Sequence, residues 1–271
     1  MTAARPPRRT RGQFRRPPPL PAGLAAGGRW LYGRHAVAAA LANPARRWRR
    51  LAVLAGQERE AKALVAAARA RRHGEGEAVN VVEPRDLARI LPREAVHQGL
   101  ALEVEPLEEP SLDAVLEGAG PAAIVIVLDR VADPHNVGAV LRSAAAFGAL
   151  AVLVPVHGAP PAAGALAKAA SGALESVPLV GVVNLARALD RLKEDGFWVC
   201  GLAEGAREAF SAVEFGARVA LVLGAEGEGM RRLVRERCDR LARLPTRADF
   251  ASLNVSNAAA VALYEITRQR G

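Results

Sequence analysis

Residues 123–148 read AIVIVLDRVADPHNVGAVLRSAAAFG, and this stretch indicates the fold class. Ala123–Leu128 is an uninterrupted apolar run rich in β-branched residues, which is typical of a strand buried on both faces of a parallel sheet. Polar residues follow the run, and a helix is predicted over Asn136–Phe147. A buried strand that leads directly into a helix is the repeating unit of an α/β domain.

The same alternation continues to the end of the chain. Further strands are predicted at 151–154, 177–180, 197–201, 219–223 and 241–244, and helices at 161–170, 184–195, 230–236 and after residue 254. We therefore predict an α/β domain over residues 122–271, with a parallel sheet covered by helices on both faces.

A smaller α/β domain is predicted over residues 29–105, and a linker rich in proline and acidic residues over 106–121. The predicted strands of this domain are 50–54, 78–82 and 100–104, and its helices are 36–41, 58–72 and 84–91; the linker holds a short helix at 111–117. Trp30, Tyr32 and Trp48 lie among arginines, and such aromatic residues either stack on RNA bases or pack in the core.

Residues 1–28 hold six arginines, six prolines and no acidic residue. Such a segment cannot bury enough surface to fold by itself, so we predict a disordered tail. The tail is either a solvated leader or an arginine arm that contacts phosphates. It lacks the apolar central region of a secretory signal.

The chain of 271 residues has a formal net charge of +9, which favours a polyanionic partner, nucleic acid ahead of a membrane surface. No apolar run reaches the ~20 residues that span a bilayer. The two cysteines are far apart and the five histidines lack metal-ligand spacing. We therefore expect no metal site, no membrane contact, and a reducing, cytoplasmic location.

Three loops of the larger domain carry candidate site residues, because ligands bind at the carboxyl ends of strands in open parallel sheets. In the first loop, Arg130 ends a strand and Arg142 lies about two turns into the following helix. Asn136 is a natural N-cap, and that could be its whole role. Arg142 could equally occupy a solvated helix face, and we interpret His135 as a loop residue rather than a base.

The second loop, LVLGAEGEGM at 221–230, places Gly224, Gly227 and Gly229 between a strand and a helix. The spacing is neither the dinucleotide fingerprint nor a P-loop. The glycines permit close approach of a ligand to the backbone. Glu226 and Glu228 disfavour a phosphate-bearing cofactor and tolerate a cationic one.

The third loop belongs to LPTRADFASLNVSNAAAVALYE, residues 244–265. Ser252, Asn254, Ser256 and Asn257 offer more hydrogen-bonding groups than one helix cap requires. The alanine-rich helix that follows permits another backbone to approach closely. The stretch is therefore either an ordinary capped, buried helix or a loop that wraps a ligand.

Together the three loops resemble those of the SpoU (TrmH-type) RNA ribose 2′-O-methyltransferases of the SPOUT superfamily. The matching segments are DPHNVG at 133–138 with LRSA at 141–144, LGAEGEGM at 223–230, and LP at 244–245 with SLNVS at 252–256. Ser171–Ala173 with Glu175 is similar to the middle segment of that family. The start YGRHAV at 32–37 is similar to the N-terminal domain of the subfamily that methylates a guanosine in bacterial 23S rRNA.

The resemblance implies a deep trefoil knot in the larger domain, S-adenosyl-L-methionine bound in the knot, a homodimer, and a ribosomal-protein-like RNA-binding fold for the smaller domain. It implies that Arg142, Asn136 and Glu226 are catalytic. The implied cofactor-binding residues are Leu223, Gly224, Leu244, Thr246, Ser252, Leu253 and Asn254, and the implied RNA-binding residues are Arg34, His35 and Arg130.

The implied reaction is 2′-O-methylation of a guanosine ribose in 23S rRNA. Because arginine keeps its proton at neutral pH, we expect Arg142 to clamp a phosphate and stabilise charge rather than to act as a base. We expect Glu226 to fix its loop and to pair with Arg142. Ala248 and Asn257 depart from the usual Gly and Val of relatives. The alternatives are a SpoU enzyme for tRNA, a resistance-type 23S rRNA methyltransferase, and a non-catalytic RNA-binding protein.

Overall fold

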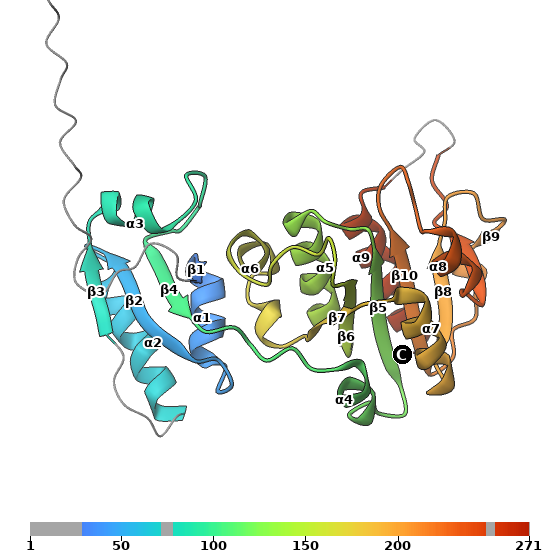
Figure 1. Cartoon of the computed structure of the whole chain (residues 1–271), viewed down its shortest axis with the longest axis horizontal. Helices are drawn as coiled ribbons and strands as arrows, with labels where there is room; N and C mark the ends of the chain where they lie inside the picture. Colours follow the sequence, from blue (N-terminus) through green and yellow to red (C-terminus); the bar gives the residue numbers. More distant parts are fainter. Residues whose placement is uncertain (1–28, 72–77, 248–252, 271) are drawn as a thin grey trace, which may run out of the picture.

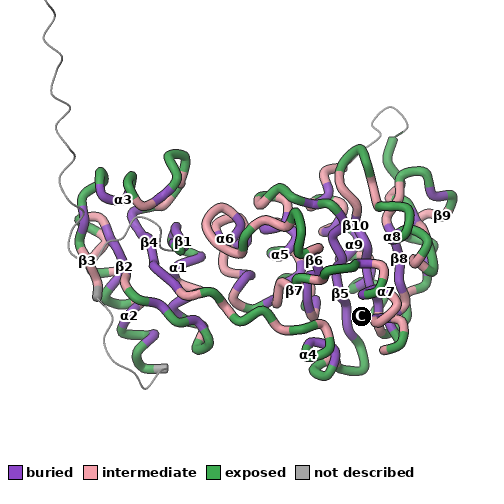
Figure 2. The backbone as a smooth tube through the Cα atoms, in the orientation of Figure 1, coloured by how far each residue is buried: buried purple, intermediate pink, exposed green. Residues whose placement is uncertain are grey.

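The computed structural model describes residues 29–71, 78–247 and 253–270, which form two sheets with helices packed on them (Figure 1). The central strands of both sheets are buried, whereas most connecting loops are exposed (Figure 2). The predicted tail at 1–28 and the predicted residues Ala248 and Ser252 lie outside the described residues.

The smaller sheet has the strand order β1-β4-β2-β3, with β2 and β3 parallel and β4 antiparallel to both of its neighbours. Its elements are β1 (Trp30–Tyr32), α1 (Arg34–Ala42), β2 (Trp48–Leu54), α2 (Glu58–Arg71), β3 (Ala78–Val82), α3 (Pro84–Ile90) and β4 (Leu100–Val104).

Three aromatic side chains of this sheet pack in its core. Trp30, Tyr32 and Trp48 are each at least nine-tenths buried, so of the two alternatives packing in the core is confirmed. Strand β1 was not predicted, because three residues are too few to show a period. Pairing of β1 with β4 accounts for the burial of its aromatic residues.

The segment between the sheets carries one short helix, α4 (Leu112–Glu117). The Ser111 hydroxyl accepts a hydrogen bond from the Ala114 amide at 3.1 Å, so it caps the helix as serine commonly does. The predicted helix at 111–117 is therefore confirmed, with Ser111 as its cap.

The larger sheet has the order β7-β6-β5-β10-β8-β11-β9, and each recorded strand pairing is parallel. Its elements are β5 (Ala123–Asp129), α5 (Pro134–Ala146), β6 (Ala151–Pro155), α6 (Gly164–Ala170), the 3-10 helix η1 (Ala173–Glu175), β7 (Leu179–Val182), α7 (Leu185–Glu194), β8 (Trp198–Leu202), β9 (Glu208–Ala209), the 3-10 helix η2 (Phe210–Ala212), β10 (Arg218–Gly224), α8 (Arg232–Glu236), β11 (Arg240–Arg243) and α9 (Val255–Arg270). The predicted parallel α/β class is confirmed.

Alternate residues of β5 explain how helices cover both faces of this sheet. Ile124, Ile126 and Leu128 pack with α5, α6 and α9 in one core cluster. Val125 and Val127 pack in a second cluster with α4, α7 and α8. Every residue of β5 is buried, as its uninterrupted apolar run predicts.

Several predicted boundaries differ from the structure, among them the starts of α1, β2 and α5, each two residues earlier than predicted, and two of the differences have a local reason. Helix α6 begins at Gly164 rather than residue 161, because the Pro161 carbonyl accepts from Ala163 in a turn. Strand β7 begins at Leu179 rather than residue 177, because the Val177 amide bonds back to Ala173. Helix α8 begins at Arg232 rather than residue 230. Strand β9, two residues long, was not predicted.

Strand β11 lies between β8 and β9, and α9 packs against α5 near the centre of the sheet (Figure 1). Whether the chain passes through a loop on its way from β11 to α9 depends on residues 248–252. The trefoil knot therefore stays a prediction.

No helix in the described part of the chain combines the length and apolarity that a bilayer crossing requires. Among residues 29–71, 78–247 and 253–270, no three His, Cys, Asp or Glu side chains cluster as metal ligands would. Cys200 and Cys238 are free thiols, and burial raises the pKa of each to about 12. Since the thiolate is the reactive form, both cysteines are poor nucleophiles at neutral pH.

Candidate active site

A cavity of about 290 Å³ opens at the carboxyl ends of β8, β10 and β11. This size is near the lower end of the ~300–1,000 Å³ usual for small-molecule sites. Its walls come from the segment after β8, the loop after β10, the segment after β11 and the start of α9. Five predicted cofactor residues line it, namely Leu223, Gly224, Leu244, Thr246 and Leu253.

The end of β10 requires glycine because the loop folds back against it. A Cβ atom on Gly224 would lie 2.2 Å from the Gly229 carbonyl carbon and 2.3 Å from the Met230 nitrogen. Ala225 and Gly229 also form an isolated antiparallel bridge. The second loop is therefore a tight backbone turn, and its main chain forms one wall of the cavity.

One side chain from each predicted loop meets beside this cavity. The Asn254 amide nitrogen donates to Glu226 Oε1 at 2.8 Å and to Asn136 Oδ1 at 2.9 Å. Asn136 Nδ2 lies 3.5 Å from Glu226 Oε1. The Val255 amide, at the start of α9, donates to the same carboxylate oxygen at 3.3 Å. Glu226 thus ties the second loop to α5 and to α9.

The role predicted for Asn136 as a helix cap is wrong. The cap of α5 is Asp133, whose carboxylate accepts from the His135 amide at 3.0 Å, and Pro134 is the first helical residue. Proline favours that position because it lacks the amide hydrogen that a helix start leaves unbonded. Asn136 lies one turn further on, where its side chain is available to Glu226 and Asn254.

A second contact that holds the glycine loop in place was not predicted from the sequence. Asp129, at the end of β5, is fully buried and accepts from the Arg231 amide and from Arg231 Nε, both at 2.7 Å. This contact fixes the end of the loop to the neighbouring strand. The available signal was an acidic residue placed directly after a buried apolar run, which is costly unless it is paired.

Both acidic and basic residues line the cavity. Glu226 and Glu228 come from the glycine loop and Glu204 from the segment after β8, and Arg235 and Arg243 line the same cavity. Arg130 leaves β5 with a left-handed backbone, φ 63°, and forms an ion pair with Glu228. A ligand carrying a positive centre and a negative group would find partners for both.

The remaining predicted residues lie away from the cavity lining. Arg142 and His135 are exposed and share one face of α5, seven residues apart. Glu226 Oε1 is bonded by Asn136 and Asn254 rather than by Arg142. Arg34 and His35 are exposed at the start of α1, where Arg34 pairs with Glu60.

Two family models match this chain. That of the SpoU rRNA Methylase family matches residues 123–264, and that described as RNA 2′-O ribose methyltransferase substrate binding matches residues 30–110. The fold and the matching residues define a SpoU-type protein, and the chain belongs to the SpoU rRNA methylase family.

Individual relatives are similar to this chain in sequence or in fold over most of its length. The 23S rRNA (guanosine-2′-O-)-methyltransferase RlmB of Pseudomonas syringae pv. tomato is 41% identical over 89% of this chain and 95% of its own. The SpoU methyltransferase AviRb of Streptomyces viridochromogenes, solved with the cofactor AdoMet, shares the fold with a TM-score of 0.74 at 24% identity, covering 90% and 91%. An RNA 2′-O ribose methyltransferase has a TM-score of 0.71 at 26% identity, covering 89% and 88%.

Proposed function

We propose that this protein transfers a methyl group from S-adenosylmethionine to the ribose 2′-oxygen of a guanosine in 23S rRNA, in the cytoplasm, and releases S-adenosylhomocysteine and the proton of the 2′-hydroxyl. The observation that carries the proposal is the meeting of Asn136, Glu226 and Asn254 beside the cavity. Each comes from a different loop, and a solvated helix face or a simple cap would not require their convergence. The relative named a 23S rRNA guanosine methyltransferase covers nearly the same length.

The residues of the cavity fit S-adenosylmethionine. Leu223, Leu244 and Leu253 offer apolar contacts for an adenine ring, and the backbone of the glycine loop offers hydrogen-bonding groups. The acidic loop face suits the sulfonium charge, and Arg235 or Arg243 suits the carboxylate of the methionine moiety. When bound, the cofactor supplies an electrophilic methyl group. Ser252 lies outside the described residues, and its contact with the cofactor remains part of the proposal.

The side chains around the cavity position the loops and the RNA relative to the methyl donor. Glu226 fixes the glycine loop against α5 and α9, so it shapes the methyl-donor site without needing to take a proton. Asn136 orients the ribose or the Arg142 side chain. Arg142, exposed on the same helix, binds an RNA phosphate and stabilises the charge that develops on the attacking oxygen.

The smaller sheet is the RNA-binding part of this proposal. The substrate-binding family model covers it, and Arg34 and His35 are exposed at the start of α1. Arg130 would exchange its partner Glu228 for an RNA phosphate. The net charge of +9 favours a long polyanion.

We also propose that two copies pair through α9. Val261 and Tyr264 are large apolar residues exposed by 47% and 58%, and they share a face with Asn257. Asn257 is exposed, so this departure from relatives does not disturb the core.

Val261→Asp is expected to weaken the dimer about 30-fold or more, because a central apolar contact is often worth ~2 kcal/mol. Sedimentation equilibrium measures the dissociation constant. Val183, exposed by 85% next to α7, is the matched control, and Val183→Asp should leave the dimer intact. A Val261→Asp protein that dimerises like the wild type would contradict this interface.

The proposed activity is tested by incubating the purified protein with methyl-tritiated S-adenosylmethionine and either a 23S rRNA transcript or bulk tRNA. Incorporation into the 23S transcript alone is expected. Incorporation into tRNA alone would identify a tRNA enzyme, and RNA binding without incorporation would identify a non-catalytic protein. Either result would overturn the proposal.

A further inference from the structure

The segment Ser171–Glu175 is part of the family resemblance but takes no part in the cavity. It joins α6 to η1 through two left-handed residues, Ser171 at φ 51° and Gly172 at φ 98°. A Cβ atom on Gly172 would lie 2.7 Å from the Ala39 Cβ and 3.5 Å from the His35 carbonyl oxygen of α1. The segment is therefore shaped to receive the smaller sheet's first helix.

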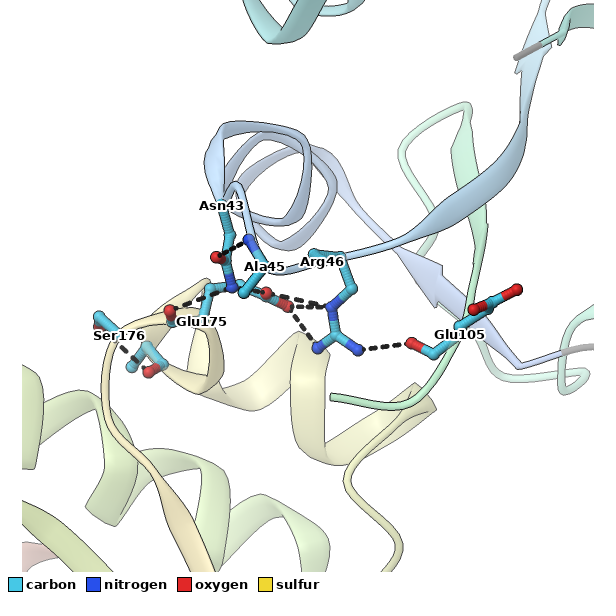
Figure 3. A network of polar contacts seen from close by, with 7 residues as sticks. Asn43, Ala45, Arg46, Glu105, Glu175 and Ser176 are labelled. Carbon is cyan, nitrogen blue, oxygen red and sulfur yellow. Dashed lines mark hydrogen bonds and ion pairs between the residues drawn. The ribbon is translucent and has the colours of Figure 1, made fainter. Parts of the chain in front are cut away.

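A buried ion pair closes this contact (Figure 3). Arg46, between α1 and β2, donates through Nη2 to Glu175 Oε1 at 2.7 Å and through Nε to both carboxylate oxygens at 3.1 Å. Their side chains are 2% and 6% exposed. Arg46 Nη1 also donates to the Glu105 carbonyl at 2.9 Å, where the segment between the sheets begins.

Asn43 donates a further hydrogen bond to the Glu175 carboxylate. Its amide nitrogen donates to Glu175 Oε2 at 2.8 Å, while its oxygen accepts from the Ala45 amide at 2.9 Å. A buried carboxylate is tolerated only when it is paired and hydrogen-bonded. Within the described part of the chain, the donors to the Glu175 carboxylate are Asn43 and Arg46 of the smaller domain, so the burial of Glu175 depends on the docking of the two parts.

A second polar contact lies along the same junction. Lys168 of α6 donates to Gln98 Oε1 at 2.9 Å, and Gln98 also accepts from the Arg34 amide at 3.1 Å. Gly33 lies beneath the Lys168 side chain, where a Cβ would fall within 3.0 Å of three of its atoms. The junction thus extends from Glu175 along α6 to the start of α1, where Arg34 and His35 lie.

The other side of α6 supports the helix that carries the proposed catalytic residues. A Cβ on Gly138 of α5 would lie 2.5 Å from Ala169 Cβ and 2.8 Å from the Ala170 nitrogen and the Leu166 oxygen. Helix α5 carries Asn136 and Arg142. The α6–η1 segment is therefore packed between the smaller sheet and the proposed catalytic helix.

We propose that Glu175 is a positioning residue: with Arg46 and Asn43 it locks the smaller sheet onto the α6–η1 segment, so that RNA held there reaches Arg142 across a fixed span. The inference rests on the proposed function for its kinetic part. Linked domains usually move relative to one another unless their interface holds them. With the two parts held at a fixed spacing, the nucleotide that reaches the active site is the one that lies at the matching distance from the RNA element bound by the smaller sheet.

The lock is tested in the full chain with spin labels on Ala66→Cys in α2 and Arg187→Cys in α7, both exposed positions. Cys200 is buried and Cys238 half-buried, and burial raises the pKa of both thiols, so labelling of the parent chain without the two new cysteines is the background control. With labelled chains diluted in excess unlabelled chain, so that distances within one protomer dominate, a single narrow distance distribution is expected for the parent and a broad one for Glu175→Gln and for Arg46→Met. Asn43→Ala, a milder change, should broaden it partly. Arg191→Met breaks the exposed Arg191–Asp113 pair and is the matched control, with no broadening expected.

The kinetic readout separates positioning from general damage. Glu175→Gln should raise the KM for a 23S transcript about 10-fold, corresponding to ~1.4 kcal/mol, while the kcat and the dissociation constant for S-adenosylmethionine stay unchanged. Unchanged distance distributions in both Glu175→Gln and Arg46→Met would overturn the lock, whatever the activity. Absence of methylation in the parent protein would instead overturn the proposed function and leave the distance result standing.

Discussion

Arg142→Ala is expected to lose methyl transfer while retaining S-adenosylmethionine binding. Arg142 is exposed on α5 and does not line the cavity, so its removal leaves the proposed cofactor wall intact. Its proposed work lies in the RNA complex, where a guanidinium would bind a phosphate and stabilise charge on the attacking oxygen. Removal of one such preorganised donor typically lowers kcat on the order of 100- to 1,000-fold.

The measurement is single-turnover methylation at saturating RNA, with calorimetric titration of the cofactor beside it. Arg142→Lys keeps the charge but loses the planar fork, so an intermediate rate is expected. If this variant has the same pH–rate profile as the wild type, the residue at position 142 does not act as the proton acceptor. Full activity of Arg142→Ala would remove Arg142 from the mechanism.

Gly224→Ala is expected to weaken cofactor binding about 10- to 100-fold. The added methyl would meet backbone atoms of Gly229 and Met230 at 2.2 and 2.3 Å, and backbone cannot swing aside as a side chain can. Overpacking of this kind costs ~1–3 kcal/mol, which corresponds to about 10- to 100-fold in affinity if the glycine loop alone is displaced. Because Asp129 and Glu226 both fasten this loop, its displacement would also disturb α9 and α5.

Gly216→Ala is the matched control, because it lies just before the same strand and its Cβ would meet no atom within 4 Å. Both variants are compared by calorimetric titration of S-adenosylmethionine and by thermal unfolding. Wild-type affinity in a folded Gly224→Ala protein would show that the loop after β10 is not the cofactor wall.

The parallel fold could be predicted from Ala123–Leu128 because a strand buried on both faces shows no alternation, and the structure buries every residue of β5. Strand order could not be predicted, since the position of β11 between β8 and β9 depends on contacts between distant segments. Two-residue β9 and three-residue β1 are too short to carry a pattern.

The sequence predicted which residues lie at the candidate site, but not the hydrogen bonds and ion pairs that join them. The carboxyl-end rule placed the three loops together, and five residues line one cavity. Asn136 was misassigned because Asp133 and Pro134 form a better helix start three residues earlier. The Arg46–Glu175 pair joins residues 129 positions apart, so neither its burial nor its partner could be seen in the local sequence.

In the proposed function, the three loops form one S-adenosylmethionine site that methylates a guanosine ribose of 23S rRNA. This function is tested most directly by mass spectrometry of nucleosides and site mapping on an unmodified 23S transcript after incubation with the protein and the cofactor. We expect 2′-O-methylguanosine at one position, formed by the wild type and, at a cofactor concentration near the wild-type dissociation constant, far less by Gly224→Ala. A methyl group on a base, on another nucleotide's ribose, or on no nucleotide of the transcript would contradict it.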